Sequence, residues 1–241
     1  MCRPLRRAPG RRLELVKPAR VLLVRIAIVL AIVAWIAAPF AIVGRLGWPA
    51  GWCYFAALAC GLLAQRAYVA RHNPGLRAAR SEIGPNTPGW DLTWNVVFWW
   101  LMAAAPMVAA AEHRARGAPL PLWTWGLGVF LLAVGLGLSA AAMAVNPFFE
   151  GTVRVQTERA QTVIETGPYA RVRHPGYLGL CLWALATPLL LRSQVAFSVA
   201  LVVVAWVTLR AALEDRLLRR GLAGYEAYTR KVRWRLLPGV W

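Results

Sequence analysis

Six long apolar segments follow one another along the chain, and they limit what it can fold into more than any other feature. They cover roughly residues 21–43, 48–66, 91–111, 121–145, 176–191 and 194–213. A helix needs about 20 predominantly apolar residues to cross the hydrocarbon core of a bilayer, and most segments approach that length. The sequence therefore predicts an all-α integral membrane protein with five or six transmembrane helices, the short fifth segment being the uncertain one. Only Arg192-Ser193-Gln194 separate the last two segments, which predicts a tight helical hairpin.

The balance of residue types supports this prediction. Of the 241 residues, 59% are hydrophobic and 16% are charged, whereas about a quarter of the residues are charged in a typical soluble domain. On a soluble chain the net charge of +18 would suggest nucleic acid, but here the charges lie between apolar segments. There they set topology and attract anionic headgroups, so membrane lipids and not nucleic acid are the expected partners. The cysteines form no CxxC pair and no Cys/His cluster, so no metal site is predicted.

The positions of Lys and Arg predict the orientation of the chain. If the N-terminus lies inside and all six segments span, 23 of the 28 Lys and Arg residues fall on the inner side and four on the outer side. Loops with such an excess of positive charge are cytoplasmic, so both termini are expected in the cytoplasm. The basic N-terminus could be part of a signal peptide, but the apolar run after it is too long, and we expect a retained first helix.

One polar stretch, Thr166–Gly179, concentrates groups that can do chemistry, including one of three histidines. Pro175 restricts His174 to extended geometry and suits the first turn of the fifth helix. A helix N-terminus presents free N–H groups to a carboxylate or phosphate. His174, Tyr177 and the amides near Gly176 could therefore line a site for a polar small molecule. An ordinary interfacial loop anchored by Arg and Tyr is an equally good interpretation of the spacing.

Three further stretches are informative. Residues 152–164 alternate β-branched and polar side chains, which favours an extended segment or a short strand. Arg210 and Glu214 share a helix face where the sixth helix leaves the bilayer. They form either a surface ion pair or part of a binding site, because ionisable residues at the end of a membrane helix often mark a site. In a site, Arg210 would bind a carboxylate or phosphate, and Glu214 would bind an ammonium group. The aromatic and basic tail, residues 224–241, could lie on the headgroups or fold back as a lid.

Together these motifs resemble the isoprenylcysteine carboxyl methyltransferase family, which is related to the membrane phospholipid methyltransferases. The resemblance rests on Gly167-Pro168-Tyr169, on Arg173-His174-Pro175-Gly176-Tyr177-Leu178-Gly179 and on Arg210 followed by Glu214-Asp215. It extends from about Asn146 to a tail with Tyr225, Tyr228 and Leu237-Pro238. The combination is fairly specific, whereas either motif alone would be weak.

The resemblance implies a membrane enzyme that holds S-adenosylmethionine in a cytoplasmic pocket closed by the C-terminal segment. Arg210 would hold a substrate carboxylate and Glu214 would act beside it. Cofactor contacts would fall on Gln156, Gln161, Thr162, Val163, Ile164, Tyr169, His174, Pro175, Gly176, Tyr177, Glu214 and Asp215. Within a single membrane domain, residues 1–145 would form four transmembrane helices, and residues 146–241 a cofactor-binding loop, the hairpin and the tail. Gln161 and Asp215 depart from the family pattern, where His and a second Glu are common.

These considerations predict methyl transfer from S-adenosylmethionine to a lipid-like or prenylated acceptor. A carboxylate is the favoured acceptor group because Arg210 suits it and because it needs no general base at neutral pH. The alternatives are methylation of a phospholipid or amine, with His174 or a tyrosine as base, and a non-catalytic membrane transport or assembly protein. The Arg- and Ala-rich composition suggests a bacterial inner membrane, with the site facing the cytoplasm.

Overall fold

The computed structural model describes residues 18–80, 84 and 87–241. The basic residues before Pro18, on which the signal-peptide question depends, lie outside the described residues. The chain divides into two compact units, Met1–Ala37 and Ala38–Trp241, and each is described by itself.

The first unit contains most of α1, Pro18–Val43, a helix of 26 residues. Its apolar side chains point outward in every direction: Leu23 is 65% exposed, Leu30 62% and Val33 56%. A helix that is apolar all round is suited to a surrounding hydrocarbon phase. By length and composition, α1 is one of five described helices that could cross a membrane.

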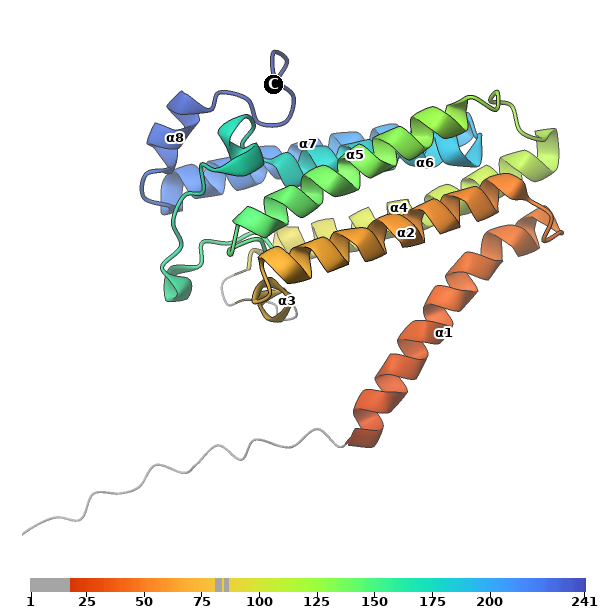
Figure 1. Cartoon of the computed structure of the whole chain (residues 1–241), viewed down its shortest axis with the longest axis horizontal. Coiled ribbons are helices and arrows are strands. Elements are labelled where there is room, and N and C mark those ends of the chain that lie inside the picture. Colours follow the sequence, from red (N-terminus) through yellow and green to blue (C-terminus); the bar gives the residue numbers. More distant parts are fainter. Residues whose placement is uncertain (1–17, 81–83, 85–86) are drawn as a thin grey trace, which may run out of the picture. The chain divides into compact units, whose positions relative to one another are not determined.

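The second unit is a bundle of long helices (Figure 1). In chain order its elements are α2 (Pro49–His72), α3 (Leu76–Ala79), α4 (Gly89–Arg116), α5 (Thr124–Val145), η1 (Thr157–Arg159), η2 (Gly167–Ala170), α6 (Pro175–Leu191), α7 (Val195–Gly221) and α8 (Tyr225–Lys231). The described residues contain no strand. The predicted all-α membrane architecture is therefore confirmed, with α2, α4, α5 and α7 joining α1 as candidate spans.

α6 is the short fifth segment, and its 17 residues correspond to about 25 Å of helix. At its C-terminal end, Thr124 Oγ1 and Trp125 Nε1 of α5 donate to the carbonyls of Leu189 and Leu190 at 3.2 and 2.8 Å. Nearer its start, Ser139 Oγ donates to the Gly176 carbonyl at 3.4 Å. α6 thus lies antiparallel along most of α5. It ends at Leu191 and α7 begins at Val195, which confirms the predicted hairpin.

Glycines allow α5 and α6 to approach at backbone contact. A Cβ added to Gly135 would lie 2.7 Å from the Gly179 carbonyl oxygen, and one added to Gly179 would lie 2.1 Å from Ser139 Oγ. Small residues have this role in membrane helix pairs, where close packing replaces the hydrophobic driving force. The contact fixes the first turn of α6, which belongs to the candidate site.

The loop and the tail differ in how well they were predicted. Of the two alternatives for residues 152–164, the short strand is wrong, because these residues form no strand and contain the single helical turn η1. Side chains satisfy its backbone in place of a sheet partner, since Asp91 Oδ2 accepts from Val153 N at 2.9 Å. The tail folds back, with Arg173 N and His174 N donating to the carbonyls of Trp234 and Arg235, each at 2.9 Å.

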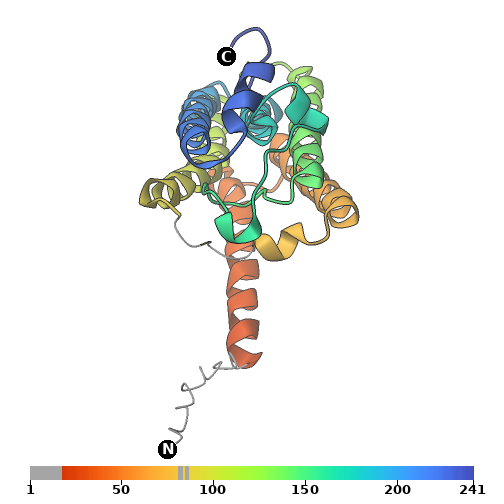
Figure 2. The ribbon, with the colours of Figure 1, turned by 90° about the vertical axis from the view of Figure 1, so that its left-hand side faces the viewer.

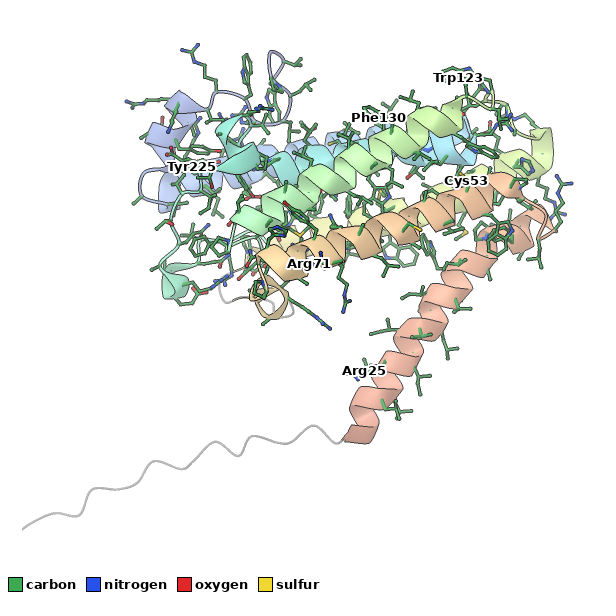
Figure 3. All side chains as sticks on the ribbon, in the orientation of Figure 1. Arg25, Cys53, Arg71, Trp123, Phe130 and Tyr225 are labelled. Carbon is green, nitrogen blue, oxygen red and sulfur yellow. The ribbon has the colours of Figure 1, made fainter. Side chains whose placement is uncertain are left out.

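The loop, α8 and the tail lie together over one end of the bundle, as the view from that end shows (Figure 2). Arg71 and Tyr225 lie toward this end, and Cys53 and Trp123 toward the other (Figure 3). The end that carries the loop also contains the start of α4, the start of α6 and the end of α7. The residues predicted to do chemistry come from these elements.

Candidate functional site

A cavity of about 390 Å³ lies at this end of the bundle. Near the helix ends its walls are polar, with Asn95, Tyr177 and Glu214 among the lining residues. One or more turns further into the bundle the lining is apolar and consists of Leu62, Phe98, Trp99, Leu136, Leu180 and Trp183. The cavity therefore has a polar part and an apolar part that form one continuous space. One elongated ligand can occupy both parts.

Most of the predicted site residues meet at this cavity. The residues that line it are Gln156, Gln161, Thr162, Val163, Ile164, Tyr169, His174, Gly176, Tyr177, Arg210 and Glu214. Two predicted contacts, Pro175 and Asp215, do not belong to the lining. Pro175 is instead the first residue of α6, in the position predicted for it.

Tyr177 contacts both Glu214 and His174. The hydroxyl of Tyr177 donates to Glu214 Oε2, and its ring stacks on His174 with centroids 5.5 Å apart. The Nε2 atom of His174 is buried and faces Asp215, whose Oδ1 lies 3.5 Å away. The carboxylate of Glu214 on this wall suits a ligand that carries an ammonium group, and the His174 ring lines the same cavity.

Asp215 lies away from the cavity lining and holds the C-terminal segment against the bundle. It is completely buried and is 2.8 Å from Arg173 Nε, 3.1 Å from Arg235 Nε and 3.3 Å from Arg219 Nε. Tyr225 donates to its Oδ1 at 3.0 Å. Burial is the main cause that raises the pKa of Tyr225, and the negative charge of Asp215 raises it further. This phenol therefore stays protonated and remains a donor. In this arrangement Asp215 acts on the site through the residues that it joins.

Arg210 occupies a largely enclosed position on the cavity wall. Its guanidinium carbon lies 4.1 Å from the centroid of Trp94 and 5.4 Å from that of Tyr177. Its Nη2 is 2.8 Å from Asp91 Oδ1 and donates to the Gly151 carbonyl at 2.8 Å. Its Nε is buried and has no hydrogen-bond partner among the described residues. An arginine held through one nitrogen, with an unused donor, can still bind an anion.

The loop residues Gln156 and Gln161 hold the loop in shape as well as lining the cavity. Gln161 Oε1 accepts from Gln156 N, and Gln156 Nε2 donates to the Phe148 carbonyl, both at 2.8 Å. Tyr169 links the loop to α5, since Asn146 Nδ2 donates to its hydroxyl at 2.9 Å. Burial raises the pKa of Tyr169, which therefore stays neutral.

Two contributors to the site, Asp91 and Trp94, were missed by the sequence interpretation. Both lie near the start of α4, and both contact Arg210 across 116 or more positions of sequence. One signal was available, because Asp91 is an acidic residue at the start of an apolar segment. Ionisable groups in such helices are rare and often mark a site.

Comparison with known proteins supports the resemblance found from the motifs. Residues 126–220 match the Isoprenylcysteine carboxyl methyltransferase (ICMT) family. Two relatives, from Oryza sativa subsp. indica and subsp. japonica, are each described as a probable protein-S-isoprenylcysteine O-methyltransferase. Each is 32% identical to this chain over 95 residues, which are 38% of this chain and 49% of the relative.

The similarity to this family is thus confirmed for the segment that carries the motifs, and the chain spans about half the length of the curated relatives it matches. The matched residues begin before Asn146, within α5, and end before Tyr225 and Tyr228. They include His174, Arg210 and Glu214 but not Asp91 or Trp94.

Proposed function

We propose that this integral membrane protein is an S-adenosylmethionine-dependent methyltransferase that methylates the carboxylate of a lipid-like or prenylated acceptor. The observation that carries the proposal is Arg210, which lines the cavity with a buried Nε that lacks a partner among the described residues. A guanidinium of this kind is suited to a carboxylate.

The polar part of the cavity fits the cofactor. When bound, S-adenosylmethionine supplies a methyl group on a positively charged sulfur, which is already activated for displacement. Glu214 can accept a hydrogen bond from its ammonium group, and the ring of His174 lines the same cavity. Val163 and Ile164 supply apolar surface beside them.

The proposed reaction requires little chemistry from the side chains of the protein. An acceptor carboxylate is ionised at neutral pH, so no side chain has to remove a proton. The protein must align the carboxylate, hold the cofactor and exclude water. Arg210 serves the first task, Glu214 and His174 serve the second, and the aromatic lining of the cavity serves the third.

The apolar part of the cavity suits the hydrocarbon portion of the acceptor. Phe98, Trp99 and Trp183 supply an aromatic lining there, and burial of apolar groups against such a wall favours binding by about 25 cal/mol per Å². The names of the two relatives specify isoprenylcysteine, and we infer a prenylated or similarly apolar carboxylic acid for this chain. A bacterial inner membrane, with the cavity facing the cytoplasm, is the proposed location.

Calorimetric titration of the detergent-purified protein tests the cofactor first. S-Adenosylhomocysteine is expected to bind the wild type, and Glu214→Gln is expected to weaken binding about tenfold to a hundredfold. The reason is that a hydrogen bond to a charged group contributes about 1.5–3 kcal/mol. Glu226→Gln, which alters an exposed glutamate on α8, is the control and should bind like the wild type. Failure of the wild type to bind at millimolar ligand would refute the enzyme proposal.

Methyl transfer to an N-acetylated, S-farnesylated cysteine tests the acceptor. Arg210→Ala should retain binding of S-adenosylhomocysteine and lose transfer by two orders of magnitude or more, because a charged ligand contact of about 3 kcal/mol is removed. Arg216→Ala removes an exposed arginine from the same helix and should transfer normally. Equal activity of the two variants would exclude Arg210 as the carboxylate-binding group.

A further inference from the structure

We propose that Asp91 is a positioning residue with two effects on Arg210: it orients the guanidinium, and it offsets part of the positive charge that the acceptor carboxylate meets. This inference rests on the proposed function. It assigns a role to a residue that lies outside the segment matched by the family.

The contacts of Asp91 show how orientation is imposed. Its side chain is completely buried, and its two oxygens lie 2.8 and 3.1 Å from Nη2 of Arg210. The Gly151 carbonyl accepts from the same Nη2 at 2.8 Å. The two hydrogens of Nη2 are therefore taken by the protein, which leaves the Nε hydrogen and those of Nη1 for a ligand. The Trp94 ring, 4.1 Å away, fixes the plane of the guanidinium.

Asp91 also joins the arginine to the wall that faces the cofactor. Its Oδ2 accepts from Val153 N at 2.9 Å, within the loop that continues to Gln156 and Ile164. Asn95, one turn further along α4, donates to the same oxygen at 3.3 Å. One carboxylate therefore sets the relative positions of the acceptor-binding arginine and the loop, and alignment of the two reactants depends on it.

The charge of Asp91 matters because the acceptor loses its own charge in the reaction. The carboxylate is negative in the ground state, partly neutralised in the transition state and neutral in the ester product. An arginine with no counter-charge would bind the ground state more strongly than the transition state, and such binding slows turnover. A buried aspartate beside Arg210 reduces this difference.

Steady-state kinetics of Asp91→Asn with the N-acetylated, S-farnesylated cysteine test the inference. We expect kcat to fall about tenfold and KM for the acid to fall several-fold, the pattern that marks tighter ground-state binding. A merely structural defect would lower the active fraction and leave KM unchanged. Glu112→Gln is the matched control: Glu112 is buried on the same helix but pairs with Ser193 and Val195 at the far end. Its KM should stay at the wild-type value.

Binding measurements separate this inference from the proposed function. We expect Asp91→Asn to increase the preference for the farnesylated acid over its methyl ester several-fold. S-Adenosylhomocysteine binding should stay unchanged, because an amide oxygen at position 91 can still accept from Val153 N and hold the loop. Asp91→Glu keeps the charge but displaces it, so kcat should fall with no change in that preference. An unchanged or raised KM in Asp91→Asn, or full activity in Asp91→Glu, would overturn the role of Asp91. A wild type that binds the cofactor product but neither the acid nor its ester would overturn the acceptor assignment and this role with it.

Discussion

At the scale of single residues, the two members of the acidic pair have separate tasks. Glu214 lines the cavity, whereas its neighbour Asp215 is buried between Arg173, Arg219 and Arg235. Successive residues of a helix point about 100° apart, so two adjacent carboxylates cannot serve the same pocket equally. Asp215 thus ties the start of α6, the end of α7 and the tail to one point.

Asp215→Asn is expected to release the C-terminal segment. Loss of one partner from a buried ion pair costs about 3–5 kcal/mol, because the remaining charge is left uncompensated, and Arg173 is itself buried. Thermal unfolding and limited proteolysis of the tail measure the effect. Glu226→Gln, which breaks an exposed pair with Arg219, should cost no more than about 1 kcal/mol. Equal stability of the two variants would show that Asp215 does not hold the segment.

Pairings between residues set a limit on what the sequence could predict. The acidic pair and His174 were found because they lie in short motifs. Asp91 and Arg210 are 119 positions apart, and no local pattern relates one to the other. Only the packing of α4 against α7 brings them together, where Trp94 Nε1 donates to the Trp206 carbonyl at 2.8 Å.

At the scale of elements, the close contact of α5 and α6 depends on the face that each glycine occupies. Gly135 faces the backbone of α6, whereas a Cβ on Gly137 would meet nothing within 4 Å. The two residues lie on the same helix and differ only in this respect, so they form a matched pair for mutation.

Gly135→Ala is expected to force α5 and α6 apart and to destabilise the bundle by about 1–3 kcal/mol, as overpacking of a well-filled contact does. Because α6 contributes Gly176 and Tyr177 to the cavity, cofactor binding should weaken as well. Gly137→Ala should be neutral or slightly stabilising, since alanine is the better helix former. Thermal unfolding in detergent and titration with S-adenosylhomocysteine would show both effects, and identical behaviour of the two variants would contradict the close-contact interpretation.

The helices were predictable and the loop was not, for a physical reason. A membrane helix satisfies its own backbone, so an apolar run of sufficient length identifies it. α7 continues to Gly221, beyond the predicted end at about residue 213, because its polar last turns lie past the apolar run. In residues 152–164, by contrast, backbone groups are satisfied by distant side chains such as Asp91, and the alternation of residue types gave no indication of this.

At the scale of the whole molecule, the orientation predicted from positive charge can be measured. In a variant without its four cysteines, a single cysteine at Arg230 should be protected from a membrane-impermeant thiol reagent in intact cells. A cysteine in place of Arg116, at the C-terminal end of the candidate span α4, should be labelled. The expectation follows from the excess of Lys and Arg on the inner side. Labelling at position 230 in intact cells, with none at 116, would mean that the orientation is the reverse.

The two-part cavity has a consequence for how the proposed catalyst can be altered. Leu62, Phe98 and Trp99 of the apolar part come from α2 and α4, outside the residues matched by the family. The loop, His174 and Glu214 come from within them. Half of the apolar lining therefore comes from outside the matched residues, whereas Leu136, Leu180 and Trp183 come from within them. Under the proposed function, a library confined to Leu62, Phe98 and Trp99 would sample new apolar acids for esterification while the loop, His174 and Glu214 stay unchanged.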